Sequence, residues 1–240
     1  MTTYRYSLEG STPLHKTDLF RLFNNYRVYK YIIELLVDLG ITDLNSYKIL
    51  EPGCGDGNKL RFFTELRALP ENCYGLEISD TSIELCKKLS PAAMNFVQGS
   101  ALDMPFEQDF FDIILCSGLF GCFNNEQDIR KISSELNRVL KRSGILFVLD
   151  LNENFNDIYS SNPYVMEKGF NTFDSTAGEL ESLLQEFTVI SIIPAFACEN
   201  YGRFDRTPAQ VTDLPRIDAA IDNGDRKCGY TLWTFFKKLE

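Results

Sequence analysis

The stretch Lys48-Ile-Leu-Glu-Pro-Gly-Cys-Gly-Asp-Gly57 decides the fold. A short apolar run ends in an acid and breaks into three alternating glycines, Gly53, Gly55 and Gly57, before the helix-compatible run 58–63. Glycines here permit positive φ and leave no Cβ between the backbone and a ligand lying across the turn. The pattern predicts a strand, a tight turn and a helix start, and open α/β sheets bind nucleotides at such turns.

Two acids indicate which nucleotide this turn would bind. A dinucleotide site favours the spacing G-x-G-x-x-G, but here the third glycine comes one residue early. Glu51 also places a carboxylate where a diphosphate would be repelled and a cationic ligand favoured. The next expected strand, 73–78, contains Glu77 about twenty residues after the turn, where such folds place a carboxylate on ribose hydroxyls. The spacing favours a positively charged nucleoside with a free 2′-hydroxyl, and the alternative is an ordinary βα loop.

Three further segments follow these two in a specific order. The five are Ile49-Leu-Glu-Pro-Gly-Cys-Gly-Asp-Gly57, Gly75-Leu-Glu-Ile-Ser79, Val97-Gln-Gly-Ser-Ala-Leu-Asp-Met-Pro-Phe106, Phe111-Asp-Ile-Ile-Leu115 and Leu136-Asn-Arg-Val-Leu-Lys-Arg-Ser-Gly-Ile-Leu146. Together they resemble the class I S-adenosylmethionine-dependent methyltransferases of the small-molecule type, closely over about residues 45–150 and loosely outside. The resemblance implies a Rossmann-like α/β fold: a mostly parallel seven-stranded sheet with helices on both faces and an antiparallel last strand.

The resemblance also implies a cofactor site for S-adenosyl-L-methionine, with S-adenosyl-L-homocysteine as the product. The family commonly has an aspartate for the adenine amino group where this chain has Ser100, so that contact is expected to be weaker or supplied otherwise. Asp103 is a candidate for part of this role, or a turn or helix cap. The implied cofactor-binding residues are Glu51, Gly53, Cys54, Gly55, Glu77, Ile78, Ser100, Ala101, Leu102 and Cys116.

The acceptor side is predicted from the loops after the fourth and fifth strands. Phe120 is a candidate for the pocket wall, or for ordinary apolar packing. A helix is expected over 126–141, because Lys141 and Arg142 suit its C-terminal dipole. Asp150 and Asn152 lie at the end of the strand expected over 144–151, where polar groups face the ligand, although an Asx cluster can equally cap a loop. Arg203 is available to hold an anionic acceptor, unless it is simply solvated.

A hydroxyl acceptor would need a general base, whereas a carboxylate acceptor would not. The single histidine, His15, is a candidate catalytic base if the N-terminal segment folds over the pocket, and otherwise an exposed loop residue. Asp150 is the alternative base.

The chain of 240 residues is long enough for one α/β domain with a full core. Apolar residues recur at helical spacing over 17–39, as one or two helices, and Gly40 closes the pattern. We therefore expect an N-terminal helical cover over 1–44 and a methyltransferase domain over 45–240. Within that domain, the long connection 197–228 is expected to be a lid-like insertion or a dimer element.

Composition excludes several classes of function. A formal net charge of −10 argues against a non-specific nucleic-acid binder, which needs clustered Lys and Arg. No apolar run reaches about eighteen residues and the N-terminus has no apolar signal region, so we expect a soluble cytoplasmic protein without a membrane partner. The seven cysteines form no C-x-x-C pair and a single histidine accompanies them, so no metal site is expected.

The predicted function is methyl transfer from S-adenosyl-L-methionine to a small-molecule acceptor, by O- or N-methylation. A sugar or natural-product intermediate is suggested only by analogy of fold. Two alternatives stay open: a non-methylating enzyme of the same fold that binds the same cofactor, and a non-catalytic binding or regulatory subunit. The expected partner is the small-molecule substrate, and a homodimer is left open.

Overall fold

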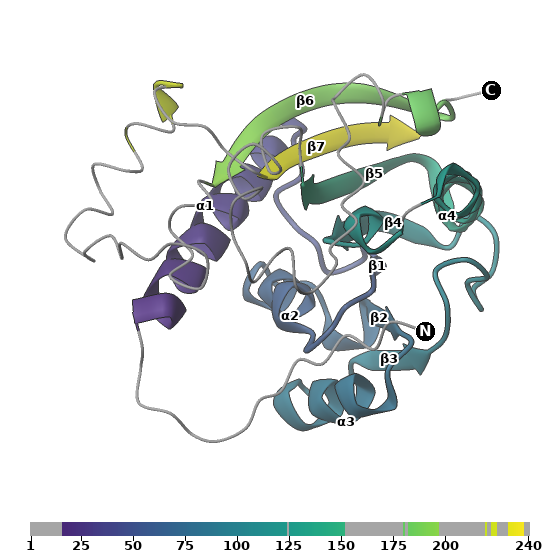
Figure 1. Cartoon of the computed structure of the whole chain (residues 1–240). Coiled ribbons are helices and arrows are strands. Elements are labelled where there is room, and N and C mark those ends of the chain that lie inside the picture. Colours follow the sequence, from purple (N-terminus) through teal and green to yellow (C-terminus); the bar gives the residue numbers. More distant parts are fainter. Residues whose placement is uncertain are drawn as a thin grey trace, which may run out of the picture.

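The computed structural model describes residues 16–123, 125–151, 180, 182–196, 219, 222–224 and 230–237. Its centre is a seven-stranded sheet with the order β3-β2-β1-β4-β5-β7-β6 (Figure 1). The first five strands run parallel, and β7 lies antiparallel between β5 and β6. The fold predicted from the sequence is confirmed. The strands are β1 (Ile49–Pro52), β2 (Cys73–Glu77), β3 (Asn95–Gln98), β4 (Phe111–Ser117), β5 (Leu140–Leu151), β6 (Phe187–Phe196) and β7 (Tyr230–Lys237).

Helices cover both faces of the sheet (Figure 1). One face packs under α1 (Lys16–Asp38) and α2 (Asn58–Glu65), which share a buried cluster with alternate residues of β1, β4 and β5. The other face packs under α4 (Glu126–Val139) and the side chains of Leu180, Leu183 and Leu184. The period-two alternation of each central strand supplies one residue set to each face. The remaining helices are α3 (Asp80–Leu89) and the short 3₁₀ helices η1 (Pro70–Asn72) and η2 (Phe120–Cys122).

The N-terminal helix is one continuous helix that contributes to the core. Val28, Ile32 and Leu36 recur at helical spacing and are buried against the sheet. The helix ends in a Schellman motif, in which Gly40 takes φ +72° and the N–H of Ile41 donates to the carbonyl of Leu36 at 2.8 Å. The division into a cover over 1–44 and a domain over 45–240 stays a prediction, and residues 1–15 lie outside the described residues.

A partly buried polar contact joins α1 to the late part of the chain. The Arg27 guanidinium donates to Asp222 Oδ1 at 2.8 Å and to the Tyr31 hydroxyl at 2.7 Å, and that hydroxyl donates to the same Asp222 oxygen. Burial raises the pKa of Tyr31 well above its ordinary value, and the hydrogen bond to Asp222 raises it further. Asp222 falls within the expected lid-like insertion 197–228, most of which lies outside the described residues, so the lid stays a prediction.

The boundary between α4 and β5 differs from the expectation. The helix was expected to run to residue 141 and the strand to begin at 144, but α4 ends at Val139 and β5 begins at Leu140. Leu140 pairs with Phe111 of β4, and the register then shifts, so that the residues after Leu140 form a bulge with Ser143 at φ 57°. The Lys141 ammonium binds Asp112 Oδ1 at 2.8 Å instead of the helix terminus.

Gly75 in β2 leaves no room for a side chain. A Cβ there would lie 2.7 Å from both Cys54 Sγ and Phe96 Cδ1. Because overpacking forces neighbours off their preferred positions, Gly75→Ala is expected to lower the free energy of unfolding by about 1–3 kcal/mol, measured by urea unfolding. A double-mutant cycle with Cys54→Ala, which removes one of the two contacts, should recover part of the loss. Unchanged stability in Gly75→Ala would contradict this close approach.

Candidate cofactor and acceptor site

The glycine-rich turn between β1 and α2 needs its glycines for conformation and for space. Gly53, Gly55 and Gly57 have φ of +70°, +55° and +72°, a region that residues with a Cβ rarely adopt. The N–H of Gly53 donates to the carbonyl of Leu76 in β2 at 2.7 Å. A Cβ on Gly53 would also lie 3.2 Å from Leu119 Cδ1, in the loop after β4. The turn is therefore bonded to β2 and lies close to the loop after β4.

Glu51 lies behind this turn and is almost fully buried, at 3% exposed. Its Oε2 accepts the N–H of Leu60, in the first turn of α2, at 2.9 Å. Gly57, the residue before that helix, has no side chain to cap it, so Glu51 supplies the capping oxygen from the strand. Burial raises the pKa of Glu51 to about 8, while the charge of Lys59 acts in the opposite direction.

Glu77, at the end of β2, joins two loops of the site. Its Oε2 accepts the N–H of Gly55 at 3.0 Å, and its Oε1 accepts the N–H groups of Ile78 at 2.9 Å and Ser79 at 3.1 Å. The Ile78 side chain beside it is 70% exposed, so an apolar surface adjoins the carboxylate. This arrangement fits a ligand with hydroxyl groups and an apolar ring.

The cysteines of the site are buried thiols. Cys54 Sγ lies 3.9 Å from Cys86 Sγ, and Cys86 Sγ in turn donates to the carbonyl of Gly55 at 3.1 Å. The hydrogen bond to Cys86 and burial both raise the pKa of Cys54, so this thiol stays protonated. Burial likewise raises the pKa of Cys116, at the end of β4. These residues can contact a cofactor through their main chain, and their thiols fill space.

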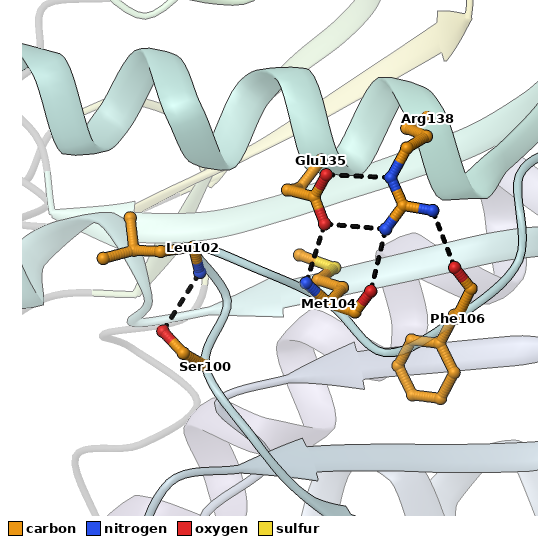
Figure 2. Close-up of polar contacts among 6 residues, drawn as sticks. All are labelled: Ser100, Leu102, Met104, Phe106, Glu135 and Arg138. Atoms are coloured by element: carbon orange, nitrogen blue, oxygen red, sulfur yellow. Dashed lines mark hydrogen bonds and ion pairs between the residues drawn. The ribbon is translucent and has the colours of Figure 1, made fainter.

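The loop after β3 follows the strand that pairs with β2, and Figure 2 shows its polar contacts. It is tied to β2 because the N–H of Gly99 donates to the carbonyl of Glu77 at 3.0 Å. The Ser100 hydroxyl accepts the N–H of Leu102 at 3.2 Å, which folds the loop into a tight turn. Among the described residues, no acceptor is found for the N–H of Ala101, at the tip of that turn. The turn therefore leaves one main-chain donor for a ligand.

The loop after β4 is shaped by Asp150. This buried carboxylate at the end of β5 accepts the N–H of Phe120 through Oδ2 at 2.8 Å and that of Gly121 through Oδ1 at 3.2 Å. It thus caps η2, and both its oxygens have main-chain donors. The Phe120 side chain, 1% exposed, packs in the core beneath α4. A substrate contact by Phe120 stays a prediction, with ordinary packing as its observed role.

Three site candidates lie outside the described residues: His15, Asn152 and Arg203. Within the part of the chain that is described, no group of histidine, cysteine, aspartate and glutamate residues could hold a metal ion. In the same part, no helix has the length and apolar character to cross a membrane.

The structure therefore gathers the candidate cofactor residues at one edge of the sheet. The carboxyl ends of β1, β2 and β3 are linked there through Gly53, Glu77 and Gly99, and the roles of these residues in binding stay predictions. Sequence reasoning missed the contacts of Cys86, Leu119, Glu135 and Arg138. For the last two a signal exists, since Glu135 and Arg138 are spaced i, i+3 on a helix and so share a face.

Comparison with known proteins gives a family for this site. Residues 50–148 match a family model described as a methyltransferase domain. The phthiotriol/phenolphthiotriol dimycocerosates methyltransferase of Mycobacterium tuberculosis is 32% identical over 47% of this chain and 40% of its own length. The demethylmenaquinone methyltransferase of Thermotoga maritima is 30% identical over 59% of this chain and 64% of its own. The chain thus spans less than two thirds of each of these curated relatives.

Solved structures share the fold at low sequence identity. A geranyl diphosphate C-methyltransferase from Streptomyces coelicolor, solved with S-adenosyl-L-homocysteine, has a TM-score of 0.62 at 15% identity, over 89% of this chain and 80% of that one. An S-adenosylmethionine-dependent methyltransferase from Mesorhizobium loti has a TM-score of 0.60 at 15% identity, over 81% and 93%. The family match thus covers residues 50–148, from β1 to β5, and identifies this part of the chain as a methyltransferase domain.

Proposed function

We propose that this chain transfers the methyl group of S-adenosyl-L-methionine to a small-molecule acceptor and releases S-adenosyl-L-homocysteine. The observation that carries the proposal is the position of Glu77, whose carboxylate holds the glycine-rich turn and the Ile78 loop together. A carboxylate at the end of the second strand suits ribose hydroxyls. The exposed Ile78 and the N–H of Ala101 would then contact the adenine base of the cofactor, and the glycine-rich turn would lie along the rest of it.

Methyl transfer from a sulfonium is an in-line displacement, in which a bond from the acceptor atom to the methyl carbon forms as the carbon–sulfur bond breaks. The positive charge of sulfur disappears in this step. The contribution of the protein is therefore chiefly to align the acceptor atom, the methyl carbon and the sulfur. The loops around Gly53 and Leu119, which approach each other closely, are the elements that would set this alignment.

For the acceptor, the contacts of Asp150 favour a positioning role over that of a base. Both its oxygens accept main-chain N–H groups of the loop after β4, so this carboxylate already holds that loop in place. His15 remains the alternative base. An amine or carboxylate acceptor fits the described site with the fewest further assumptions, since neither needs a strongly basic side chain.

Two lines support a small-molecule acceptor over a nucleic acid. The net charge of −10 opposes binding to a polyanion. The similar proteins are named for phthiotriol dimycocerosates, demethylmenaquinone and geranyl diphosphate, none of which is a nucleic acid.

The test is product analysis with S-adenosyl-L-methionine and pools of sugars, acids, amines and hydroxylated aromatics. Formation of S-adenosyl-L-homocysteine that depends on an acceptor, and is lost in Glu77→Ala, is the expected result. Consumption of the cofactor without S-adenosyl-L-homocysteine would identify a non-methylating enzyme instead. Binding without consumption in any pool would favour a regulatory subunit.

A further inference from the structure

Two side chains of α4 hold the main chain of the loop that follows β3. Arg138 binds Glu135 through two parallel hydrogen bonds, from Nε to Oε1 at 2.8 Å and from Nη2 to Oε2 at 2.7 Å. This is the fork geometry in which a guanidinium matches a carboxylate. The hydrogen bonds lower the pKa of Glu135, so the pair stays charged.

The remaining hydrogen-bonding atoms of the pair reach the loop (Figure 2). Glu135 Oε2 accepts the N–H of Met104 at 2.7 Å, and Arg138 Nη2 donates to the carbonyl of the same residue at 2.8 Å. Arg138 Nη1 donates to the carbonyl of Phe106 at 2.6 Å. The pair therefore binds both the N–H and the carbonyl of Met104, as a neighbouring antiparallel strand would.

The held residue lies close to the part of the loop that borders the cofactor site. Met104 is buried in the core, and the turn from Ser100 to Asp103 directly precedes it. At its other end this turn is tied through Gly99 to the carbonyl of Glu77. The turn is thus fixed at two points, one on β2 and one on α4.

We propose that Glu135 and Arg138 are positioning residues for the cofactor. By holding Met104, they fix the position of the Ser100–Leu102 turn, and so of the Ala101 N–H, relative to the adenine base. This inference rests on the proposed function, because the proposed function makes S-adenosyl-L-methionine the ligand of that turn. Neither side chain needs to touch the cofactor. Arg138 acts through Met104, and Glu135 acts through both Met104 and Arg138.

The expected consequence is a selective loss of cofactor affinity. Arg138→Met removes two charge-assisted hydrogen bonds to the loop and keeps the apolar stem. We expect the dissociation constant for S-adenosyl-L-homocysteine to rise about tenfold. The KM for S-adenosyl-L-methionine should rise similarly, while kcat at saturating cofactor changes less than about twofold, because the filled site restores the turn.

The matched control is the neighbouring ion pair of the same helix. Arg130 Nε binds Glu126 Oε1 at 2.7 Å, also between adjacent turns of α4, but both side chains are exposed. Arg130→Met should therefore leave the cofactor affinity unchanged. Arg138→Lys keeps the charge but not the planar fork, so it should restore little of the affinity.

The experiment measures binding and local opening together, at a temperature well below the melting of every variant. Calorimetric titration compares S-adenosyl-L-homocysteine with S-inosyl-homocysteine, which differs only in the base. The preference for the adenine form should shrink in Arg138→Met, a change that a general loss of stability would not produce. Hydrogen exchange of the Met104 amide in the unliganded protein should accelerate in Arg138→Met and not in Arg130→Met.

Each outcome bears on one proposal or both. A wild type that binds, beside an Arg138→Met variant that binds equally well, would overturn the positioning role alone. Faster Met104 exchange together with unchanged base preference would also overturn it, because the loop would then be held without serving the cofactor. A wild type that binds neither ligand and forms no S-adenosyl-L-homocysteine would overturn the proposed function, and this inference with it.

Discussion

Glu77→Ala is expected to lower the affinity for S-adenosyl-L-methionine by about a hundredfold, the largest effect on binding among the substitutions considered. The change removes the proposed partner of the ribose hydroxyls, and hydrogen bonds to a charged group contribute about 1.5–3 kcal/mol each. It also releases the N–H groups of Gly55, Ile78 and Ser79, so that two loops lose their common acceptor. Calorimetric titration with S-adenosyl-L-methionine and S-adenosyl-L-homocysteine measures the effect.

Two variants separate the contact from the charge. Asp80→Ala removes an exposed acid three residues further along the chain and should leave the affinity nearly unchanged. Glu77→Gln keeps one acceptor oxygen and should lie between the wild type and Glu77→Ala. If Glu77→Ala binds as the wild type does, the carboxylate has no part in the cofactor site.

Glu51 should make the stability of the unliganded protein fall as the pH rises. Its pKa is raised by burial from the ordinary 4.5 to about 8. Below pH 4.5 the carboxyl is protonated in the folded and unfolded chains alike. Between pH 4.5 and 8 the folded protein holds a proton that the unfolded chain has lost, so the free energy of unfolding decreases. Above pH 8 the loss is complete and this contribution is flat.

Glu51→Gln isolates this contribution, because its amide oxygen can still accept the N–H of Leu60 and it does not titrate. At about 1.4 kcal/mol for each pKa unit, the variant should gain on the wild type by up to roughly 5 kcal/mol between acid and alkaline pH. Urea unfolding at about pH 5, 7 and 9 measures the difference in the free energy of unfolding between the variant and the wild type. Glu65 is an exposed acid in α2, the helix that Glu51 caps, and Glu65→Gln should show no such trend. A constant difference across this range would mean that Glu51 is ionised throughout.

The strand, turn and helix around the glycine-rich segment were predictable because their causes are local. Alternating glycines set the backbone of the turn, and all three do adopt positive φ. The seven-stranded sheet with an antiparallel last strand came from the resemblance to a family, since the position of β7 between β5 and β6 depends on contacts far apart in the sequence.

The role of Glu51 was harder to predict. Its position at the end of β1 suggested a carboxylate facing a cationic ligand, whereas its contact with Leu60 shows that it also caps a helix. Whether such a side chain turns towards the ligand or towards the helix depends on the packing around it, which spacing does not encode. The same holds for Asp150, found at the expected strand end but bonded to the N–H groups of Phe120 and Gly121.

The start of β5 shows a conflict between local and distant preferences. Lys141 and Arg142 suit the C-terminal end of a helix, and that favoured a longer α4. Pairing of Leu140 with Phe111, together with the ion pair from Lys141 to Asp112, ends the helix earlier. Such partners lie about thirty residues away, so a reading of nearby residues could not find them.

The contact of Glu135 and Arg138 with main-chain atoms has a consequence for how this protein can evolve. The pair binds the carbonyls of positions 104 and 106 and the N–H of position 104, and every residue except proline at 104 supplies these groups. Side chains of the loop can therefore be exchanged without dismantling its attachment to α4. The residues that meet a ligand are free to diversify, while the helix that holds them keeps one glutamate and one arginine.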